Sequence, residues 1–323
     1  MASSSYIADA LRRPAGRTFL DRVRGGDEIA YSVTLVCAAL ILVVVALIVD
    51  ELWTHSQATV KAFGWHFLVT STWDPNGGKF GALPFIYGTC VTSFLALLIA
   101  VPFGIASSIF LAEMAPPKLS NLLTFLIELL AAVPSVIYGL IGIFILVPFI
   151  REAVVPVLSK SLGFLPFFQG DFYGVSFLSA GLVLSVMVVP FIVSVSREVL
   201  LAVPTEQREA ALALGATKWE TTWQIVLPTA STGIIGSVFL ALARALGETM
   251  AVTMVIGNTP RITASLFSPG YSIAAVIANE FAEASGNLYV SSLIFLGLVL
   301  FGLTIVINAS ARILILLTSQ RSA

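Results

Sequence analysis

Charged residues are scarce in this sequence. Asp, Glu, Lys and Arg together make up 11% of the 323 residues, whereas a soluble domain carries about 25%. The formal net charge is −1, so the chain has no excess of Lys and Arg from which a basic nucleic-acid-binding groove could be built. We therefore expect no nucleic-acid partner, and the composition is typical of a protein surrounded by membrane lipid.

Residues that bind metals or act as nucleophiles are also few. The two cysteines, Cys37 and Cys90, lie far apart within apolar runs, and His55 and His66 flank no acidic cluster. The sequence has no spaced Cys/His set, no Gly-rich phosphate-binding loop and no nucleophile elbow. We expect no catalytic residue, metal site or cofactor in this chain. If ATP drives its action, a partner must hydrolyse the ATP.

Hydrophobic residues are correspondingly abundant. They make up 58% of the chain, and the mean hydropathy is +0.98. A helix needs about 20 apolar residues to cross a bilayer. Six runs reach this length, namely residues 29–49, 84–111, 122–149, 175–194, 232–256 and 288–317. The sequence therefore predicts an all-α, polytopic membrane protein with six transmembrane helices.

The distribution of basic residues predicts the orientation. Several arginines precede the first apolar run, whereas Asp50 and Glu51 follow it. Because Lys and Arg are concentrated on the cytoplasmic side of membranes, we expect both termini in the cytoplasm. Residues 1–28 then form a cytoplasmic arm, residues 29–317 the six-span domain and residues 318–323 a cytoplasmic tail. The first run is too long for a signal-peptide core and lacks a clear cleavage site, so we expect it to be retained.

The longest patterned polar interruption, residues 209–228, lies between the fourth and fifth apolar runs. Its pattern predicts two short helices separated by a hinge at Gly215, where a left-handed conformation ends the first helix. Thr217 and Glu220 have the spacing of a capping box, which starts the second helix. We expect Pro228 to end that second helix. One face of the second helix should carry Trp219, Trp223 and Val226.

Two charged residues lie within the fifth apolar run. Arg244 and Glu248 are four residues apart, so they should share one helix face and be able to form an ion pair. Each charge costs about 2.5–3.5 kcal/mol at the bilayer centre. Either the two residues line a substrate pathway, or they form a structural ion pair that holds two helices together. The first interpretation is favoured because ionisable groups within membranes usually face a cavity.

Three further polar residues lie in the third apolar run. Glu128 is near the inner end of this run, where a long side chain can reach the interface. Ser135 and Tyr138 follow Pro134, which kinks or breaks a helix. Their hydroxyls could face a pathway where the backbone opens, or they could bond their own helix. The sequence does not distinguish these two alternatives.

The polar interruption resembles a known loop. Glu209-Ala210-Ala211, then Gly215, and then Ile225-x-Leu227-Pro228 resemble the EAA loop of ABC importer permeases. The resemblance implies that residues 197–230 form a coupling loop that docks on a cytoplasmic ATPase. An ordinary hairpin between two membrane helices is the alternative. The residues that the resemblance assigns to ATPase coupling are Glu209, Ala210, Ala211, Gly215, Trp219, Leu227 and Pro228.

Further motifs resemble the phosphate-specific ABC permeases. They are the stretch Arg244–Val252 with Ile256-Gly257-Asn258 after it, the stretch Pro134-Ser135-Val136-Ile137-Tyr138-Gly139, and the stretch Phe80-Gly81-Ala82-Leu83-Pro84. The last of these, together with the long outer segments, resembles the PstC-type subunits rather than the PstA-type subunits. The resemblance covers about residues 30–317 and leaves out the amino-terminal arm.

This resemblance implies the type I ABC importer architecture and the function of a permease subunit in an ATP-driven phosphate importer of the bacterial plasma membrane. The implied partners are a second, PstA-type permease, a dimer of ATPase subunits that bind ATP and Mg, and an extracytoplasmic phosphate-binding protein. The implied substrate pathway contains Arg244, Glu248, Ser135 and Tyr138. Arg244 would offer a bidentate guanidinium to phosphate oxygens. A permease for another oxyanion is the alternative.

Two functions from other classes stay open on the sequence alone. A proton-coupled secondary transporter could use Glu128, Arg244 and Glu248 as a relay, but it would have no need of an ATPase-docking loop. A non-transporting membrane scaffold would leave the intramembrane charges unexplained.

Overall fold

The structure is a computed structural model that describes residues 27–319. The chain divides into two units, Met1–Thr54 and His55–Ala323. In the first unit, the described residues form a single helix, α3 (Asp27–His55), which ends at the unit boundary. Neither Gly nor Pro interrupts this stretch, so the predicted first span lies within one continuous helix. Most of the predicted arm and tail, residues 1–26 and 320–323, lies outside the described residues.

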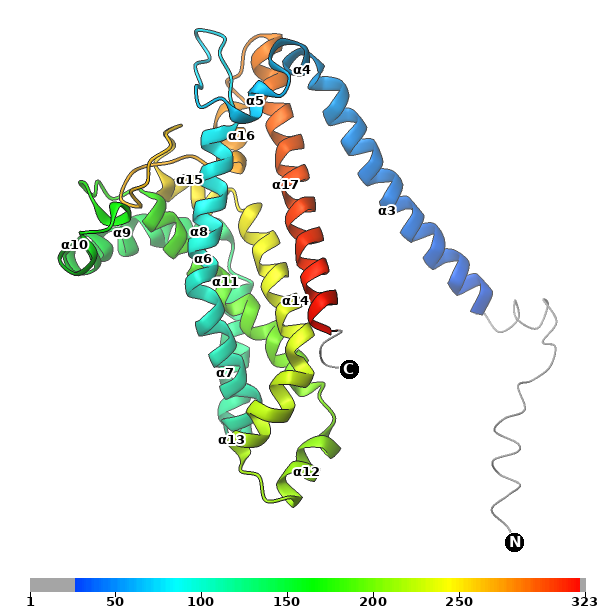
Figure 1. Cartoon of the computed structure of the whole chain (residues 1–323). Helices are drawn as coiled ribbons and strands as arrows, with labels where there is room; N and C mark the ends of the chain where they lie inside the picture. The colour runs from blue at the N-terminus through cyan, green and yellow to red at the C-terminus, as the bar shows by residue number, and fades with distance from the viewer. Residues whose placement is uncertain (1–26, 320–323) are drawn as a thin grey trace. The chain divides into compact units, whose positions relative to one another are not determined.

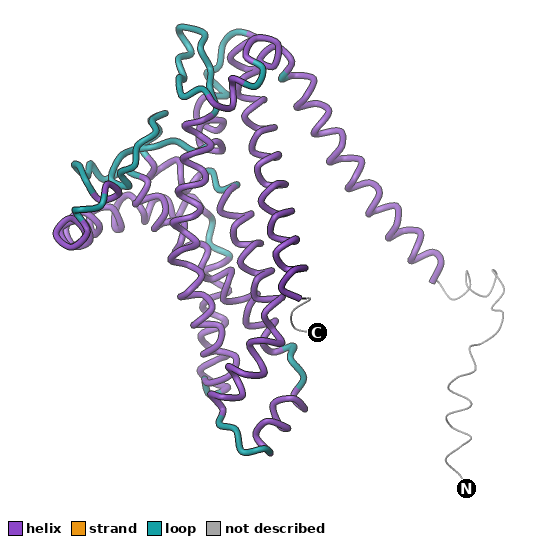
Figure 2. The backbone as a smooth tube through the Cα atoms, in the orientation of Figure 1, coloured by secondary structure: helices purple, strands orange, loops and turns teal. Residues whose placement is uncertain are grey.

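The regular secondary structure of the described residues is helical (Figure 2). These residues form no sheet, and their β-type pairing is limited to an isolated bridge between Asp74 and Lys79. Within residues 27–319, six helices are long and apolar enough to cross a membrane, which confirms the predicted all-α, six-span architecture. After α3 these are α6 (Leu83–Ile109) with the π turn η1 (Phe110–Met114), the helix Ser135–Leu162, α11 (Phe177–Leu201), the helix Lys218–Leu246, and α17 (Asn287–Ser319).

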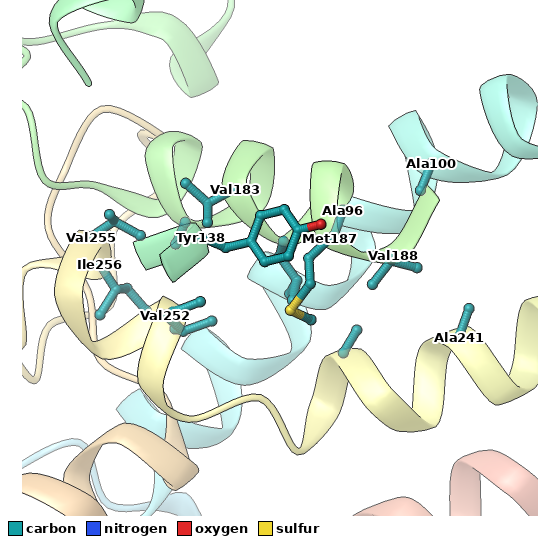
Figure 3. Packing of buried hydrophobic residues seen from close by; sticks show 14 of the residues in the cluster. Ala96, Ala100, Tyr138, Val183, Met187, Val188, Ala241, Val252, Val255 and Ile256 are labelled. Carbon is teal, nitrogen blue, oxygen red and sulfur yellow. The ribbon is translucent and has the colours of Figure 1, made fainter. Parts of the chain in front are cut away.

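The helix α11 is the centre of the second unit. It packs most extensively against α6, and it also contacts α14 (Leu227–Leu246) and α15 (Met250–Ile256). Small residues allow the close approach of α6 and α11, since a Cβ on Gly104 would lie 2.7 Å from Ile192 Cγ2. The buried core around this pair holds Val183, Met187, Val188, Val252 and Tyr138 (Figure 3).

The third span begins later than predicted. The structure forms a separate 15-residue helix, α7 (Pro117–Ala131), and the long helix starts only at Ser135. Pro134 separates the two helices because it lacks the N–H that would continue the first and its ring clashes with the preceding turn. The prediction of one span over residues 122–149 is therefore wrong at both ends.

The long helix after Pro134 passes through two further prolines without breaking. It consists of α8 (Ser135–Ile141), η2 (Gly142–Leu146), α9 (Val147–Phe149), η3 (Ile150–Val154) and α10 (Val155–Leu162). The elements η2 and η3 are π turns that lie just before Pro148 and Pro156. The residue preceding each proline donates its N–H to the carbonyl five residues earlier, as Val147 does to Gly142. Each π turn therefore keeps the helix hydrogen-bonded up to the proline.

Short helices lie at both ends of the second unit. At one end are α4 (Gln57–Phe63), α5 (His66–Val69) and α16 (Ile273–Glu280), and at the opposite end are α12 (Thr205–Ala213) and α13 (Lys218–Thr221) (Figure 1). The first of these ends is held by an aromatic cluster that contains a carboxylate. Trp73 Nε1 donates to Glu280 Oε2 (2.9 Å), and the Tyr289 hydroxyl donates to the same oxygen (2.6 Å). This carboxylate on α16 thus joins the start of α17 to the segment around Trp73, which is 207 positions away in sequence.

Candidate functional site

The hinge after α12 has the predicted geometry. Gly215 has a φ of +90°, which is the left-handed conformation expected of it. Its N–H donates to the Leu212 carbonyl (3.0 Å), and the N–H of Ala216 donates to the Ala211 carbonyl (3.1 Å). This pair of bonds is a Schellman motif, which satisfies carbonyls that the helix end would leave unpaired. The reversal of the chain after α12 is therefore fixed by backbone bonds.

The second helix of this segment starts as predicted. The Thr217 hydroxyl accepts the N–H of Glu220 (3.2 Å), and Glu220 Oε2 accepts the N–H of Thr217 (2.7 Å). These reciprocal bonds form the capping box. Two backbone motifs in succession, at Gly215 and at Thr217, thus set the angle between α12 and α13.

The outer surface of this segment carries several large apolar side chains. Trp219 and Trp223 are both about half exposed and their rings meet edge to face, with centroids 5.4 Å apart. Leu214 is 90% exposed beside the hinge. Val226, expected on the same face as the tryptophans, is instead fully buried. The π turn η5 (Thr222–Val226) changes the angular spacing of the side chains and turns Val226 into the core.

The helix does not end at Pro228, contrary to the sequence prediction. The residues from Lys218 to Leu246 form one helix, and η5 lies just before the proline. The N–H of Leu227 donates to the Thr222 carbonyl five residues earlier. A proline can stand at this point because it needs no N–H of its own in the first turn of the α-helix that follows.

The remaining residues that the resemblance assigns to coupling differ in their exposure. Glu209 and Ala210 are exposed on α12, while Ala211 is buried against the rest of the unit. Leu227 packs against the buried cluster that contains Val226 and Leu200. The segment thus has one face packed against the membrane helices and one exposed face.

Sequence reasoning missed Arg208, which lies on α12 immediately before Glu209. Its Nη2 donates to Glu113 Oε1 (2.8 Å) and to the Leu200 carbonyl (2.7 Å), and its Nη1 donates to the Val203 carbonyl. The side chains of Arg208 and Glu113 are only 17% and 12% exposed. No sequence signal identifies this ion pair, because its partners are 95 positions apart.

Arg244 and Glu248 do not form the predicted ion pair, although both belong to the described residues. The helix α14 ends at Leu246, so the two side chains do not stand on one helix face. Glu248 Oε1 instead accepts the backbone N–H of Ala251 (3.2 Å) at the start of α15. Gly247 ends α14, and Glu248 lies just before the N-cap Thr249 of α15, where the helix dipole favours a carboxylate. The predicted single span over residues 232–256 is therefore two helices.

Arg244 lies in the last turn of α14 and remains exposed. Its guanidinium carbon lies 5.7 Å from the centroid of the Phe191 ring on α11, in the range of a cation–π contact. The guanidinium thus lies beside an aromatic ring, and its N–H groups can bind an anion.

Tyr138 and Ser135 lie on α8, which packs against α15. The Tyr138 hydroxyl donates to the Leu130 carbonyl on α7 (2.7 Å), so it bonds across the break at Pro134. Tyr138 also belongs to the same buried cluster as Ala241 and Ala245 of α14. The structure therefore brings the first turn of α8 and the end of α14 into one region, whereas Glu128 is exposed on α7.

The sequence matches a family and several named relatives. Residues 83–320 match the family described as “Binding-protein-dependent transport system inner membrane component”. The phosphate transport system permease protein PstC of Mesorhizobium japonicum is 44% identical over 326 residues, which cover 98% of this chain and 99% of that protein. The protein of the same name from Haemophilus influenzae is 46% identical over 286 residues, which cover 87% and 90%.

Solved structures share the fold. A chain of a bacterial ABC transporter involved in the import of the acidic polysaccharide alginate matches with a TM-score of 0.57 and 18% identity, over 90% of this chain and 98% of that chain. A chain of the inward-facing MetNI methionine ABC transporter matches with a TM-score of 0.50 and 17% identity, over 74% and 94%. At these identities the likeness concerns the fold alone.

Proposed function

This chain belongs to the family of binding-protein-dependent inner membrane transport components and, within it, to the PstC-type phosphate permeases, and from this membership we propose how its structure serves transport. The chain is a permease subunit of a phosphate ABC importer, a multi-pass inner membrane protein with the type I importer architecture and not an enzyme. The observation that carries the mechanism is the segment from Thr205 to Val226, whose backbone motifs hold an apolar surface at one end of the helices.

We assign ATPase docking to this segment. The Schellman motif at Gly215 and the capping box at Thr217 give it a fixed shape, which reduces the entropy lost on binding. Trp219, Trp223 and Leu214 supply exposed apolar surface, and aromatic side chains of this kind dominate binding energy at interfaces. A partner that presents an apolar groove fits this surface.

We assign phosphate binding to Arg244. The guanidinium is exposed and oriented by Phe191, and its planar donor edge matches two phosphate oxygens. Glu248 acts separately, by fixing the start of α15 after the break. Ser135 and Tyr138 lie on α8, which packs against α15. A movement of α15 relative to α14 at Gly247 can therefore reach them.

The complete importer, on this proposal, holds a second permease of the PstA type, two ATPase subunits that bind ATP and Mg, and an extracytoplasmic phosphate-binding protein. The docking segment and both termini then face the cytoplasm. ATP-driven closure of the ATPase subunits moves the docking segment and opens the pathway outward, and phosphate is released inward after hydrolysis.

The test is reconstitution of the four components in lipid vesicles. Phosphate-loaded binding protein should stimulate ATP hydrolysis and drive phosphate uptake, whereas sulfate should do neither. ATP-dependent sulfate uptake at the rate of phosphate would favour a permease for another oxyanion. Phosphate uptake that follows a proton gradient without ATP would favour a secondary transporter.

A further inference from the structure

One side chain joins three helices next to the docking segment. Arg208, on α12, bonds Glu113 in the π turn that ends α6, and it bonds the Leu200 and Val203 carbonyls at the end of α11. The docking segment is otherwise held to the membrane helices by its own chain, by the apolar packing of Val226, and by a long hydrogen bond from Thr229 to Gln207 (3.5 Å). Arg208 is therefore its principal polar attachment to α6 among the described residues.

The burial of the Arg208 contacts strengthens them relative to contacts at the protein surface. The Arg208 and Glu113 side chains are mostly removed from water, so their attraction is screened less than that of a surface pair. The two carbonyls belong to the last turn of α11 and the residues just after it, where backbone acceptors lack helical partners and a positive charge is favoured. Replacing one partner leaves the other polar group buried without its bond.

The helices that Arg208 reaches are those that pack together most extensively in the unit. Gly104 allows Ile192 to approach the α6 backbone, and Gly181 allows Leu95 to approach α11. A closely packed pair moves as a body, because its interface does not deform continuously. A displacement of α12 that pulls on the inner ends of α6 and α11 therefore moves the pair together.

We propose that the Arg208–Glu113 ion pair transmits the movement of the docking segment to the α6–α11 pair. This inference rests on the proposed function, since it presupposes that an ATPase moves α12. Arg208 is a positioning residue in this role and has no contact with phosphate. If the pair served only to stabilise the fold, its loss would lower assembly and would not separate hydrolysis from transport.

The test uses Glu113→Gln and Arg208→Lys in the complete reconstituted importer. Three quantities are measured: recovery of the ATPase with the permease, the ATP hydrolysis rate, and phosphate imported per ATP hydrolysed. Transmission predicts normal recovery and continued hydrolysis, with phosphate per ATP reduced about fivefold or more, the lower range of coupling between sites. The ratio is the informative readout because a stability defect lowers both of its terms together.

The matched control is Glu198→Gln. Arg197 and Glu198 also form an ion pair at the inner end of α11 (3.0 Å), but both residues lie on α11, so this ion pair does not join two helices. This variant should leave phosphate per ATP unchanged.

Three results would overturn the inference. An unchanged ratio in both test variants would show that movement bypasses the pair. Loss of ATPase recovery in both variants would limit the pair to holding α12 in place. An equal fall of the ratio in Glu198→Gln would remove its specificity. Failure of the parent complex to couple hydrolysis to phosphate would instead contradict the proposed function itself.

Discussion

Arg244 is the residue whose surroundings differ most from those expected. The sequence suggested an ion pair with Glu248. In the structure Arg244 instead contacts the Phe191 ring, and Glu248 accepts a backbone N–H at the start of α15. The spacing of the two residues was informative only if the helix continued. Gly247 ends it, and a glycine within an apolar run gives no certain sign of a helix end.

Substitution of Arg244 should impair transport in a graded way. Arg244→Lys keeps the charge but loses the two-pronged donor, and Arg244→Gln loses both. Loss of a hydrogen bond to a charged group costs about 1.5–3 kcal/mol, so Arg244→Gln should raise the phosphate concentration for half-maximal uptake about tenfold or more. Uptake into vesicles measures this. Parent-like uptake by Arg244→Gln would place the anion site elsewhere.

A double variant tests whether Arg244 and Glu248 act independently or as an ion pair. Because Arg244 and Glu248 make different contacts, the free-energy changes of Arg244→Gln and Glu248→Gln on uptake should add. Partial recovery of uptake in the double variant would indicate instead that the two charges interact in the working protein.

Gly215 is the second residue whose conformation can be tested. A Cβ at its φ of +90° is strained, and the left-handed region costs an L-residue about 1–2 kcal/mol. Gly215→Val should weaken ATPase recovery without lowering the thermal stability of the membrane helices. Gly236→Val is the control, since Gly236 has no atom within 4 Å of an added Cβ and has no positive φ. Equal ATPase recovery by both variants would contradict the role of the hinge.

Prolines have two different outcomes at the scale of the helices. Pro134 separates α7 from α8, whereas the helix passes Pro228 after a π turn. The residues next to each proline do not indicate which outcome follows, and the fully buried Val226 shows that the turn before Pro228 is packed in the core. The hinge at Gly215 and the capping box at Thr217 were predictable, since each depends on residues within one turn.

The Tyr138 side chain bridges the break between α7 and α8 at Pro134. Removing its hydroxyl should weaken the attachment of α8 to α7. Tyr138→Phe removes the bond to the Leu130 carbonyl, which still accepts the N–H of Val133, so stability should fall by about 0.5–1.5 kcal/mol. The thermal midpoint of the purified permease in detergent measures the loss. Tyr173→Phe is the control, because Tyr173 is 72% exposed. An unchanged midpoint in Tyr138→Phe would show that the apolar packing of the ring alone holds the break.

At the scale of the whole molecule, composition and run length were sufficient to predict six helices of membrane-spanning length. Contacts between distant residues were not predictable, such as Arg208 with Glu113 or Trp73 with Glu280. These pairs are set by the packing of helices, and a single sequence contains no record of which helices meet.

The orientation of the second unit can be measured in intact cells after Cys37 and Cys90 are replaced by serine. A cysteine introduced at the exposed Asn76 or Asn287 should react with an impermeant thiol reagent from outside. A cysteine at the exposed Lys218 should react only after the membrane is opened. Labelling at position 218 in sealed cells would reverse the predicted topology.

The π turns before Pro148, Pro156 and Pro228 also affect how this sequence is aligned with others. A bond that spans five residues instead of four encloses one residue more, so each turn is equivalent to a single-residue insertion in an α-helix. An alignment with a helix that lacks the proline should then place a one-residue gap beside it. An ungapped alignment would shift every later position in that helix by about a quarter of a turn, and residues that face one another in space would no longer be matched.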